Sequence, residues 1–503
     1  MAAYAREAQA MKNDIHDLGL MLDSRVRLIA IESWEELSVL EAIGTLAVKR
    51  GQTWYTWNQV DGLQRLGFGS AVDTTEDLTD PEQALDYIRL QREPALFVFC
   101  DLHPFMQSPR LIRQLKMLAM DVVDHAPTLL LISHELALPP ELRRLSASIS
   151  LSMPSDEQLT VIIREEAARW SEQNHGRRVR TDSKTLDKVV RNLRGVTHQE
   201  ARRLARRLIV DDGAITQEDL PALNQAKFSL LDMQGMLSFE PDTAQFADVG
   251  GLGRLKRWLA DRHSAFAQAK VPVDAPKGVL LAGVQGSGKS LAARAVAGLW
   301  ELPLLRLDVG ALFNKYIGES EKNLRNALAM ADAMEPCVLW IDEIEKGLAQ
   351  DSSDQGVSRR MLATLLTWMA ERKSRVFLVA TANDVTRLPP ELIRKGRLDE
   401  LFFVDLPDAP IREDIFRIHL ANRGLSMERF DLPALADASD GFAGAEIEQA
   451  VVSAVYSAAA QQAEIDNSYV MRALSETSPL SVVMAERVQA LRDWARDRAV
   501  PAD

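Results

Sequence analysis

The fold of the second half of this chain is decided by the stretch Gly283-Val284-Gln285-Gly286-Ser287-Gly288-Lys289-Ser290. A short apolar run, residues 278–282, precedes it, and a run of good helix formers, residues 291–297, follows it. In such a strand–loop–helix unit, glycines let backbone N–H groups turn inward around a polyphosphate, which lies at the positive end of the helix dipole. Lys289 can then reach the β- and γ-phosphates, and the Ser290 hydroxyl can bind Mg²⁺. The sequence therefore predicts a phosphate-binding loop.

A pair of carboxylates follows a second apolar run, residues 337–341. Ligands of α/β sheets collect at the carboxyl ends of parallel strands, which is where Asp342 and Glu343 would lie. We expect Asp342 to hold Mg²⁺, directly or through water, and Glu343 to orient and polarise the attacking water. Either motif alone is weak evidence, but together they predict hydrolysis of a nucleoside triphosphate.

A third region extends this pattern. Residues 376–381 form another apolar run close to Asn383, and residues 388–399 read Leu-Pro-Pro-Glu-Leu-Ile-Arg-Lys-Gly-Arg-Leu-Asp. Here the chain resembles the AAA family, specifically the branch of hexameric protein unfoldases and membrane-tethered AAA proteases. The resemblance implies that Asn383 senses the γ-phosphate. It also implies that Arg394 and Arg397 are arginine fingers for a neighbouring subunit's nucleotide, since a guanidinium neutralises charge on the transferring phosphoryl group. The alternative for these arginines is an ordinary surface ion pair.

Two more segments carry the same resemblance. Residues 246–252 are similar to the family's loop whose backbone contacts adenine, and residues 441–447 are similar to the start of its lid helix. Ala443 replaces the usual Ser there, which weakens the helix cap. The resemblance implies ATP and Mg²⁺ as cofactors, with Ser290 and Asp342 as the metal ligands. The residues expected to bind ATP are Asp248, Val249, Gly250, Gly283, Val284, Gln285, Gly286, Ser287, Gly288, Lys289, Ser290, Leu291, Gly444 and Ala445.

An aromatic–aliphatic pair lies on a Gly-containing segment, residues 315–321, where the AAA family carries its first pore loop. An exposed Tyr316 next to Ile317 would suit non-specific gripping of an extended polypeptide. The resemblance therefore implies a protein substrate that is threaded past Tyr316. The alternative is a tyrosine that packs on its own domain.

The first half of the chain reads as a damaged copy of the second. Residues 138–142 repeat residues 388–392, and the apolar runs before the two repeats are similar. By this spacing Ser133 stands where Asn383 stands. Residues 96–101 resemble the apolar run that ends at Asp342, and there Leu102 occupies the position of Glu343. No Gly-Lys-Ser or Gly-Lys-Thr occurs in the first half of the chain. Its first apolar run leads instead into residues 32–36, Glu-Ser-Trp-Glu-Glu, whose acidic side chains would repel phosphates. We expect an AAA-like domain that binds no nucleotide in the usual way; the alternative is an unrelated α/β domain.

The chain has a formal net charge of -13, which disfavours broad contact with nucleic-acid phosphates. One segment is the exception: residues 176–207 hold eleven Lys and Arg against three acidic residues. Within it, Arg202, Arg203, Arg206 and Arg207 lie on a helical face away from the apolar one. A solvated amphipathic helix is the default interpretation, and an RNA, DNA or acidic-partner surface is the alternative.

Composition limits the other possibilities. No uncharged apolar run is long enough to span a membrane, and the two cysteines, Cys100 and Cys337, lie in apolar runs typical of buried strands. These features predict a cytoplasmic protein without a membrane partner. We expect all eight histidines to be isolated from metal-ligand partners, and no His-Glu-x-x-His motif occurs. We therefore expect no fused zinc protease.

The pairing of a degenerate first half with an AAA core resembles a family first described from a conserved open reading frame of plastid genomes and also found in bacteria. Residues 54–63 and 479–495 carry this resemblance. The predicted fold is α/β throughout, with an AAA-like domain at 1–235, a P-loop AAA core at 236–409 formed by a parallel sheet with flanking helices, and a helical lid with C-terminal helices at 410–503. We expect a homo-oligomer, a hexamer by the resemblance, that remodels or threads a protein. The alternative is a nucleic-acid-associated motor or ATP-gated switch that uses residues 176–207.

Overall fold

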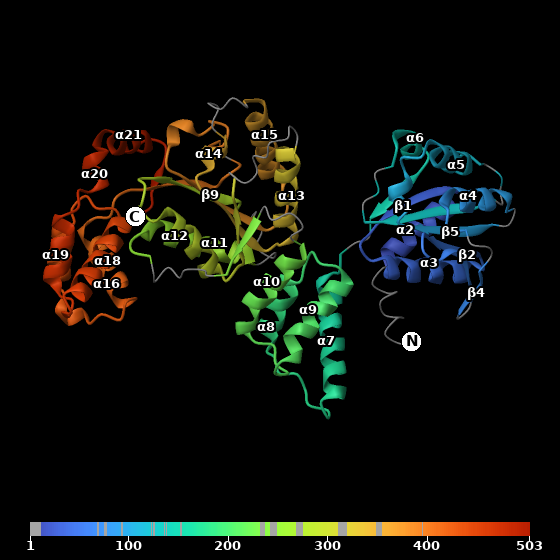
Figure 1. Ribbon diagram of the computed structural model, residues 1–503, viewed down its shortest axis with the longest axis horizontal. Helices are drawn as coiled ribbons and strands as arrows, with labels where there is room; N and C mark the ends of the chain where they lie inside the picture. The colour runs from blue at the N-terminus through green and yellow to red at the C-terminus, as the bar shows by residue number, and fades with distance from the viewer. Residues whose placement is uncertain are drawn as a thin grey trace. The chain divides into compact units, whose positions relative to one another are not determined.

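The chain forms two compact units, Met1–Arg180 with Leu193–Ala214, and Thr181–Asn192 with Ile215–Asp503. The computed structural model describes residues 12–67, 70–74, 78–91, 94–121, 123, 126–134, 136, 138–150, 153–231, 237–241, 249–267, 275–309, 319–348, 355–394 and 396–503. Within each unit the described strands form one seven-stranded sheet (Figure 1).

The sheet of the first unit has the strand order β4-β3-β2-β5-β6-β1-β7. Its strands are β1 (Leu28–Glu32), β2 (Thr53–Asn58), β3 (Gly62–Gly67), β4 (Ser70–Thr74), β5 (Ala95–Cys100), β6 (Thr128–Ser133) and β7 (Ala147–Ser150). The strands from β2 to β7 along this order pair in parallel, while β3 and β4 add an antiparallel edge. Because β1, β5 and β6 are covered on both faces, they are continuous apolar runs rather than alternating ones.

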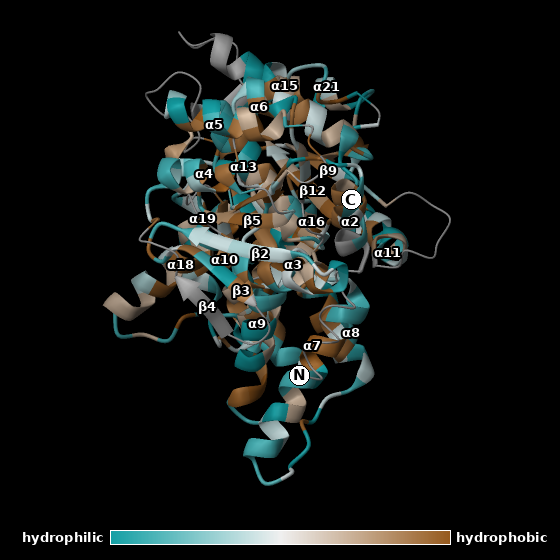
Figure 2. Ribbon diagram, turned by 90° about the vertical axis from the view of Figure 1, so that its right-hand side faces the viewer, coloured by the Kyte–Doolittle hydropathy of each residue, from teal (hydrophilic) through white to brown (hydrophobic). Residues whose placement is uncertain are grey.

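Helices cover both faces of this sheet (Figure 1). The helices α2 (Lys12–Asp23) and α3 (Glu36–Arg50) pack on one face, and α4 (Pro81–Leu90) and α5 (Pro109–Ala119) pack on the other. Successive residues of β6 alternate between these two cores, with Leu129 and Leu131 in one and Leu130 and Ile132 in the other. In Figure 2 the helices carry both teal and brown segments, as amphipathic helices that cover a sheet do.

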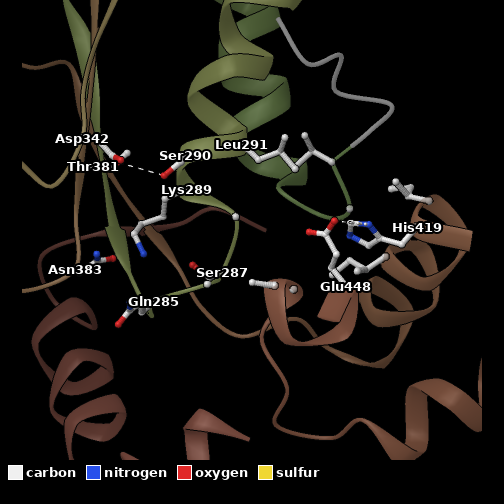
Figure 3. Close-up of a pocket in the computed structure, with 18 of the residues that line it drawn as sticks. Gln285, Ser287, Lys289, Ser290, Leu291, Asp342, Thr381, Asn383, His419 and Glu448 are labelled. Carbon is white, nitrogen blue, oxygen red and sulfur yellow. Dashed lines mark hydrogen bonds and ion pairs between the residues drawn. The ribbon is translucent and has the colours of Figure 1, made fainter. Parts of the chain in front are cut away.

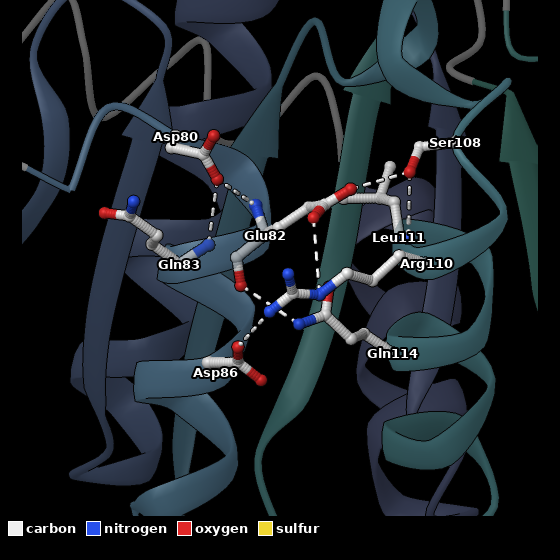
Figure 4. Close-up of polar contacts among 8 residues, drawn as sticks. All are labelled: Asp80, Glu82, Gln83, Asp86, Ser108, Arg110, Leu111 and Gln114. Carbon is white, nitrogen blue, oxygen red and sulfur yellow. Dashed lines mark hydrogen bonds and ion pairs between the residues drawn. The ribbon is translucent and has the colours of Figure 1, made fainter.

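Polar contacts fix α4 against α5 (Figure 4). Asp80 and Ser108 cap the two helices, and the Ser108 hydroxyl also donates to Glu82 Oε1 at 2.6 Å. Arg110 on α5 pairs with Asp86 on α4 at 3.1 Å. These caps explain why each helix begins at a proline, since the N1 position needs no N–H donor.

The sheet of the second unit has the strand order β14-β13-β9-β12-β11-β10-β8. Its strands are β8 (Leu237–Glu240), β9 (Gly278–Gly283), β10 (Leu304–Leu307), β11 (Cys337–Ile341), β12 (Val376–Ala382), β13 (Glu400–Val404) and β14 (Val500–Pro501). All neighbouring pairs are parallel except β10 with β8.

Both sheets share one topology. Five adjacent strands of each sheet, numbered by their order along the chain, run fifth, first, fourth, third, second: β7-β1-β6-β5-β2 in the first unit and β13-β9-β12-β11-β10 in the second. The prediction that the first half is a copy of the same α/β fold is therefore confirmed.

Helices cover both faces of the second sheet, and further helices form a lid. The helices α11 (Gly253–Ala267) and α12 (Lys289–Trp300) pack on one face of the sheet, and α13 (Glu319–Ala333), α14 (Ile344–Leu348) and α15 (Gln355–Glu371) pack on the other. A separate core joins the lid helices α16 (Ala409–Ala421), α17 (Leu432–Ala438), α18 (Gly444–Ala460) and α19 (Asn467–Ser475). The chain then returns through α20 (Leu480–Val483) and α21 (Ala485–Ala495) to β14, where Ala502 N donates to Phe403 O at 3.0 Å.

Four helices join the two sheets in sequence. They are α7 (Asp156–Gln173), α8 (Ser183–Asn192), α9 (His198–Val210) and α10 (Leu220–Leu231). The arginines of α9 include two that pair with carboxylates of α7: Arg206 lies 2.8 Å from buried Glu166, and Arg202 lies 3.2 Å from Glu165. Arg203 and Arg207 point outward and are exposed. Two of the four arginines of the predicted basic face, Arg202 and Arg206, therefore form ion pairs between α9 and α7.

The strand register corrects one expectation from the repeat. Cys100 lies opposite Ile132 in the first sheet, as Ile341 lies opposite Ala380 in the second. Aligning Asp101 with Asp342 therefore places Ser133 at the position of Thr381, rather than at the position of Asn383 as the Leu-Pro-Pro-Glu-Leu spacing indicated. The sequence spacing was wrong here because the loops between strand and repeat differ by two residues.

Among the described residues, no helix is both long enough and apolar enough to cross a membrane.

Candidate nucleotide site

A glycine loop connects β9 to α12 at the carboxyl edge of the second sheet. Gly283 ends β9 with φ of 155°, and a Cβ there would lie 2.0 Å from Val404 O. Gly286 and Gly288 have φ of 77° and 93°, which other residues rarely adopt. No side chain caps α12, since its N-cap is Gly288. The backbone N–H groups of its first turn therefore remain available to an anion.

Lys289 lies at the base of this loop and is buried. Its Nζ donates to Val284 O at 2.6 Å and to Gly283 O at 3.1 Å, so the loop's own carbonyls hold the ammonium group in place. Burial lowers the pKa of Lys289 to about 8, although the negative charges of Glu345, Asp342 and Glu343 oppose the shift. A polyphosphate in the loop would supply the negative charge that favours the protonated amine.

Thr381 ties the two acidic residues together. Its hydroxyl donates to Asp342 Oδ1 at 2.6 Å and accepts from the backbone N–H of Glu343 at 3.0 Å. The Ser290 hydroxyl lies 3.2 Å from the same oxygen of Asp342. Ser290 and Asp342 are therefore close enough to share one ion, and oxygen ligands of this kind suit Mg²⁺.

Glu343 stands in a left-handed conformation with φ of 47°, which turns its side chain away from the strand direction. Its Oε1 accepts from Asn383 Nδ2 at 2.7 Å, and its other oxygen pairs with Lys346. Below it, buried Glu345 accepts from the backbone N–H groups of Asn383 and Asp384. Burial raises the pKa of Glu345. These contacts fix the tip of β12 relative to the carboxylate of Glu343.

The lid supplies the opposite wall of a cavity of about 370 Å³ (Figure 3). Ala445 N donates to Gly286 O at 3.1 Å, which fastens the start of α18 to the glycine loop. As expected, Ala443 offers no side-chain cap; Glu446 still accepts from Ala443 N at 2.7 Å. Figure 3 shows His419 and Glu448 across the cavity from the loop residues, and His419 Nδ1 lies 3.7 Å from Glu448 Oε1.

The cavity brings together most of the residues expected from the sequence. Those that line it are Val249, Gly250, Gln285, Gly286, Ser287, Gly288, Lys289, Ser290, Leu291, Asp342, Glu343, Asn383, Gly444 and Ala445. Gly283 and Val284 lie just behind it, where their carbonyls hold Lys289. Arg394 is exposed and Arg397 donates to Glu391 O, and neither lines the cavity. Asp248 and Tyr316 lie outside the described residues.

Five further residues line the cavity: Thr381, Ile415, Ile418, His419 and Glu448. The sequence analysis missed their roles. Ile415 and His419 are four residues apart on α16, as Gly444 and Glu448 are on α18, so each pair lies on one helical face. Because Glu448 follows Gly444 by four residues, the sequence could have predicted that it lies on the same face of α18 and lines the cavity.

Comparison with known proteins agrees with this geometry. Residues 279–406 match the ATPase family associated with various cellular activities (AAA). Residues 14–151 and 157–234 match the N-terminal and second domains of SpoVK-like AAA ATPases. Over 494 residues the chain is 35% identical to the AAA domain-containing protein ycf46 of Pyropia yezoensis, and the match covers 96% of this chain and 98% of that protein. The chain belongs to the ycf46 family.

Further relatives extend this result. The ycf46 protein of Guillardia theta is 33% identical over 491 residues, covering 96% of this chain and 94% of its own length. The proteasome-activating nucleotidase of Aeropyrum pernix is 34% identical over 225 residues, covering 42% of this chain and 54% of its own length. Membership of the ycf46 family confirms the predicted resemblance to a plastid open-reading-frame family. The AAA match implies ATP binding, and the described cavity provides the loop, the buried lysine and the paired oxygens that Mg-ATP needs.

Proposed function

We propose that this AAA ATPase couples hydrolysis of Mg-ATP, in a homo-oligomeric ring, to the threading or remodelling of a protein partner. The cavity carries the proposal, because it joins Lys289 to the Asp342–Ser290 pair and the Glu343–Asn383 pair within one space. In this proposal the glycine loop, Lys289 and the lid bind ATP, while Ser290 and Asp342 hold Mg²⁺. Glu343 takes up the proton of the attacking water, and Asn383 orients Glu343 toward it.

The oligomer follows from the position of the arginines. Arg394 is exposed and has no side-chain partner among the described residues, and neither it nor Arg397 lines the cavity of its own chain. Arginine fingers would be useful only to the nucleotide of a neighbouring copy. We propose a ring of identical chains, with six as the expected number, and a cytoplasmic location.

The substrate class is proposed from two observations. A relative that matches 42% of this chain is named a proteasome-activating nucleotidase. The basic segment, which favoured nucleic acid, has Arg202 and Arg206 paired with carboxylates of α7. Protein is therefore favoured over nucleic acid, whose phosphates would need those guanidinium groups unpaired.

ATP turnover by the purified chain, measured with an unfolded protein, RNA or DNA added, tests the substrate class. We expect the unfolded protein to stimulate turnover. Tyr316→Ala should keep basal turnover but abolish remodelling of that protein, because the aromatic ring is the expected gripping contact. Arg203→Glu with Arg207→Glu serves as the matched variant and should change neither result. Salt-sensitive stimulation by RNA or DNA that the arginine variant removes, with Tyr316→Ala silent, would establish the nucleic-acid alternative instead.

A further inference from the structure

The first unit brings two histidines and an aspartate together at the sheet edge that corresponds to the nucleotide site. Asp101 directly follows β5, His103 lies in the short helix η1 (His103–Phe105), and His134 directly follows β6. Their ligand atoms all lie within 4.8 Å of one another. The expectation that the histidines are isolated from metal-ligand partners is therefore wrong for His103 and His134. They are 31 positions apart, and only the parallel pairing of β5 with β6 makes them neighbours.

The ligand atoms of Asp101, His103 and His134 lie close enough to bind one metal ion after small rotations of their side chains. His103 Nδ1 lies 3.7 Å from Asp101 Oδ1. Bonds of about 2.0–2.2 Å to one tetrahedral ion would put two ligand atoms roughly 3.3 Å apart. The Asp101 side chain is 61% exposed and can rotate, so closing the remaining gap needs no movement of the strands.

Neighbouring groups orient the two imidazoles. Ser133 Oγ lies 2.7 Å from His103 Nδ1, so an ion bound at Nδ1 would replace this hydrogen bond. The Trp34 ring lies 4.6 Å from the His134 ring, centroid to centroid, and packs against it. Ser133 is also the counterpart of Thr381, which holds Asp342 in the second unit.

The local charge favours a cation over a phosphate. Where the second unit has its glycine loop, the first has Glu32, Trp34 and Glu36. The site therefore has the opposite electrostatic character to the Lys289 loop.

We propose that the first unit binds a divalent transition-metal ion of the Zn²⁺ type through Asp101, His103 and His134. Two imidazoles with one carboxylate select Zn²⁺ or similar borderline ions over Mg²⁺, which prefers oxygen ligands alone. Three protein ligands leave one position of a tetrahedral ion for water or for a partner's side chain. The damaged copy of the nucleotide site thus becomes a metal site.

Co²⁺, which substitutes for Zn²⁺ and has visible absorption bands, provides the test. The full chain is titrated with Co²⁺ in excess Mg²⁺, which competes with Co²⁺ for the proposed site at Ser290 and Asp342. We expect one tightly held Co²⁺ per chain, with affinity at least about tenfold weaker in His134→Gln and Asp101→Asn. His16→Gln, a change at an exposed position of α2, should bind as the wild type does.

A variant that gains a new absorption band separates loss of a metal ligand from simple unfolding. His134→Cys should add a thiolate-to-cobalt charge-transfer band in the near ultraviolet, because the new ligand is sulfur. Thermal unfolding followed by circular dichroism reports whether the first unit of each variant is folded. The proposal fails if the wild type holds no Co²⁺, if the two loss variants bind it unchanged, or if His134→Cys shows no thiolate band; the trio would then be a hydrogen-bonded cluster only.

Discussion

Asn383 donates a hydrogen bond from Nδ2 to Glu343 Oε1 at 2.7 Å, so the tip of β12 directly orients the carboxylate that follows β11. The two residues are 40 positions apart and meet because their strands are parallel neighbours. A water next to Glu343 would therefore face a carboxylate whose free rotation is restricted. The pair offers a direct test of the hydrolytic role.

Glu343→Gln is expected to keep ATP binding and to lower turnover by about 10²–10⁴, the usual contribution of a general base. The amide keeps the shape of the side chain but takes up no proton, while Lys289, Ser290 and Asp342 still hold Mg-ATP. Fluorescent nucleotide binding and phosphate release measure the two effects separately. Glu476→Gln, an exposed change on the lid, is the control. Ordinary turnover by Glu343→Gln would rule out this role.

Thr381→Val should lower the turnover rate about tenfold, equivalent to about 1.4 kcal/mol on the barrier, with little change in ATP affinity. The valine cannot donate to Asp342 or accept from Glu343 N, so both acidic residues lose their common tether. Thr381→Ser keeps the hydroxyl and should retain near wild-type turnover. Turnover that is lost in Thr381→Ser but kept in Thr381→Val would show that the methyl group, rather than the hydroxyl, is what matters.

ATP binding should be linked to proton uptake through Lys289. Burial lowers its pKa from the usual 10.5 to about 8 in the nucleotide-free protein, so its burial costs stability most at pH below about 8. Stability of the nucleotide-free state therefore rises as pH increases from about 8 toward 10.5. Because phosphates favour the charged amine, ATP affinity should fall as pH rises through about 8.

Calorimetry at pH near 8, in buffers of different ionisation heat, measures this proton uptake. Lys289→Arg keeps its charge at every accessible pH and should bind ATP, if it binds at all, without the lysine's proton uptake. Lys289→Ala should lose ATP binding. An affinity that is flat across this pH range would mean that Lys289 is already fully charged before ATP binds.

Mixing two inactive variants tests the shared site. Arg394→Ala should lower turnover by about 10³–10⁵ if it removes an arginine finger, and Lys289→Ala should be inactive for lack of bound ATP. In a mixed ring, a Lys289→Ala chain still presents its arginines to a neighbour that binds ATP. Turnover should therefore reappear on mixing. No recovery in mixed oligomers, or full activity of Arg394→Ala in a monomer, contradicts the finger.

Gly213→Ala should destabilise the first unit by more than Gly176→Ala does. Both glycines have positive φ, 69° and 80°, so each alanine costs about 1–2 kcal/mol in backbone strain. A Cβ at Gly213 would lie 2.1 Å from the Trp170 ring, whereas one at Gly176 meets nothing within 4 Å. Displacing the ring should add about 1–3 kcal/mol. Urea unfolding of both variants measures the difference.

The sequence by itself determined the local parts of this protein. Gly283 to Ser290 set a strand–loop–helix unit because glycine conformations and helix dipoles act within a few residues, and Asp342 with Glu343 marked the end of a buried strand for the same reason. The repeat of residues 138–142 also revealed two copies of one fold, which the common strand order confirms.

Only the tertiary structure decided which distant groups meet. Thr381 joins Asp342 to Glu343, the lid residues His419 and Glu448 close the cavity, and His103 reaches His134, each through pairing or packing between separate elements. The corrected position of Ser133 has the same origin, since hydrogen bonds between strands, and not spacing along the chain, set the register. Sequence patterns report periodicity and local conformation, whereas these contacts depend on long-range geometry that local patterns do not contain.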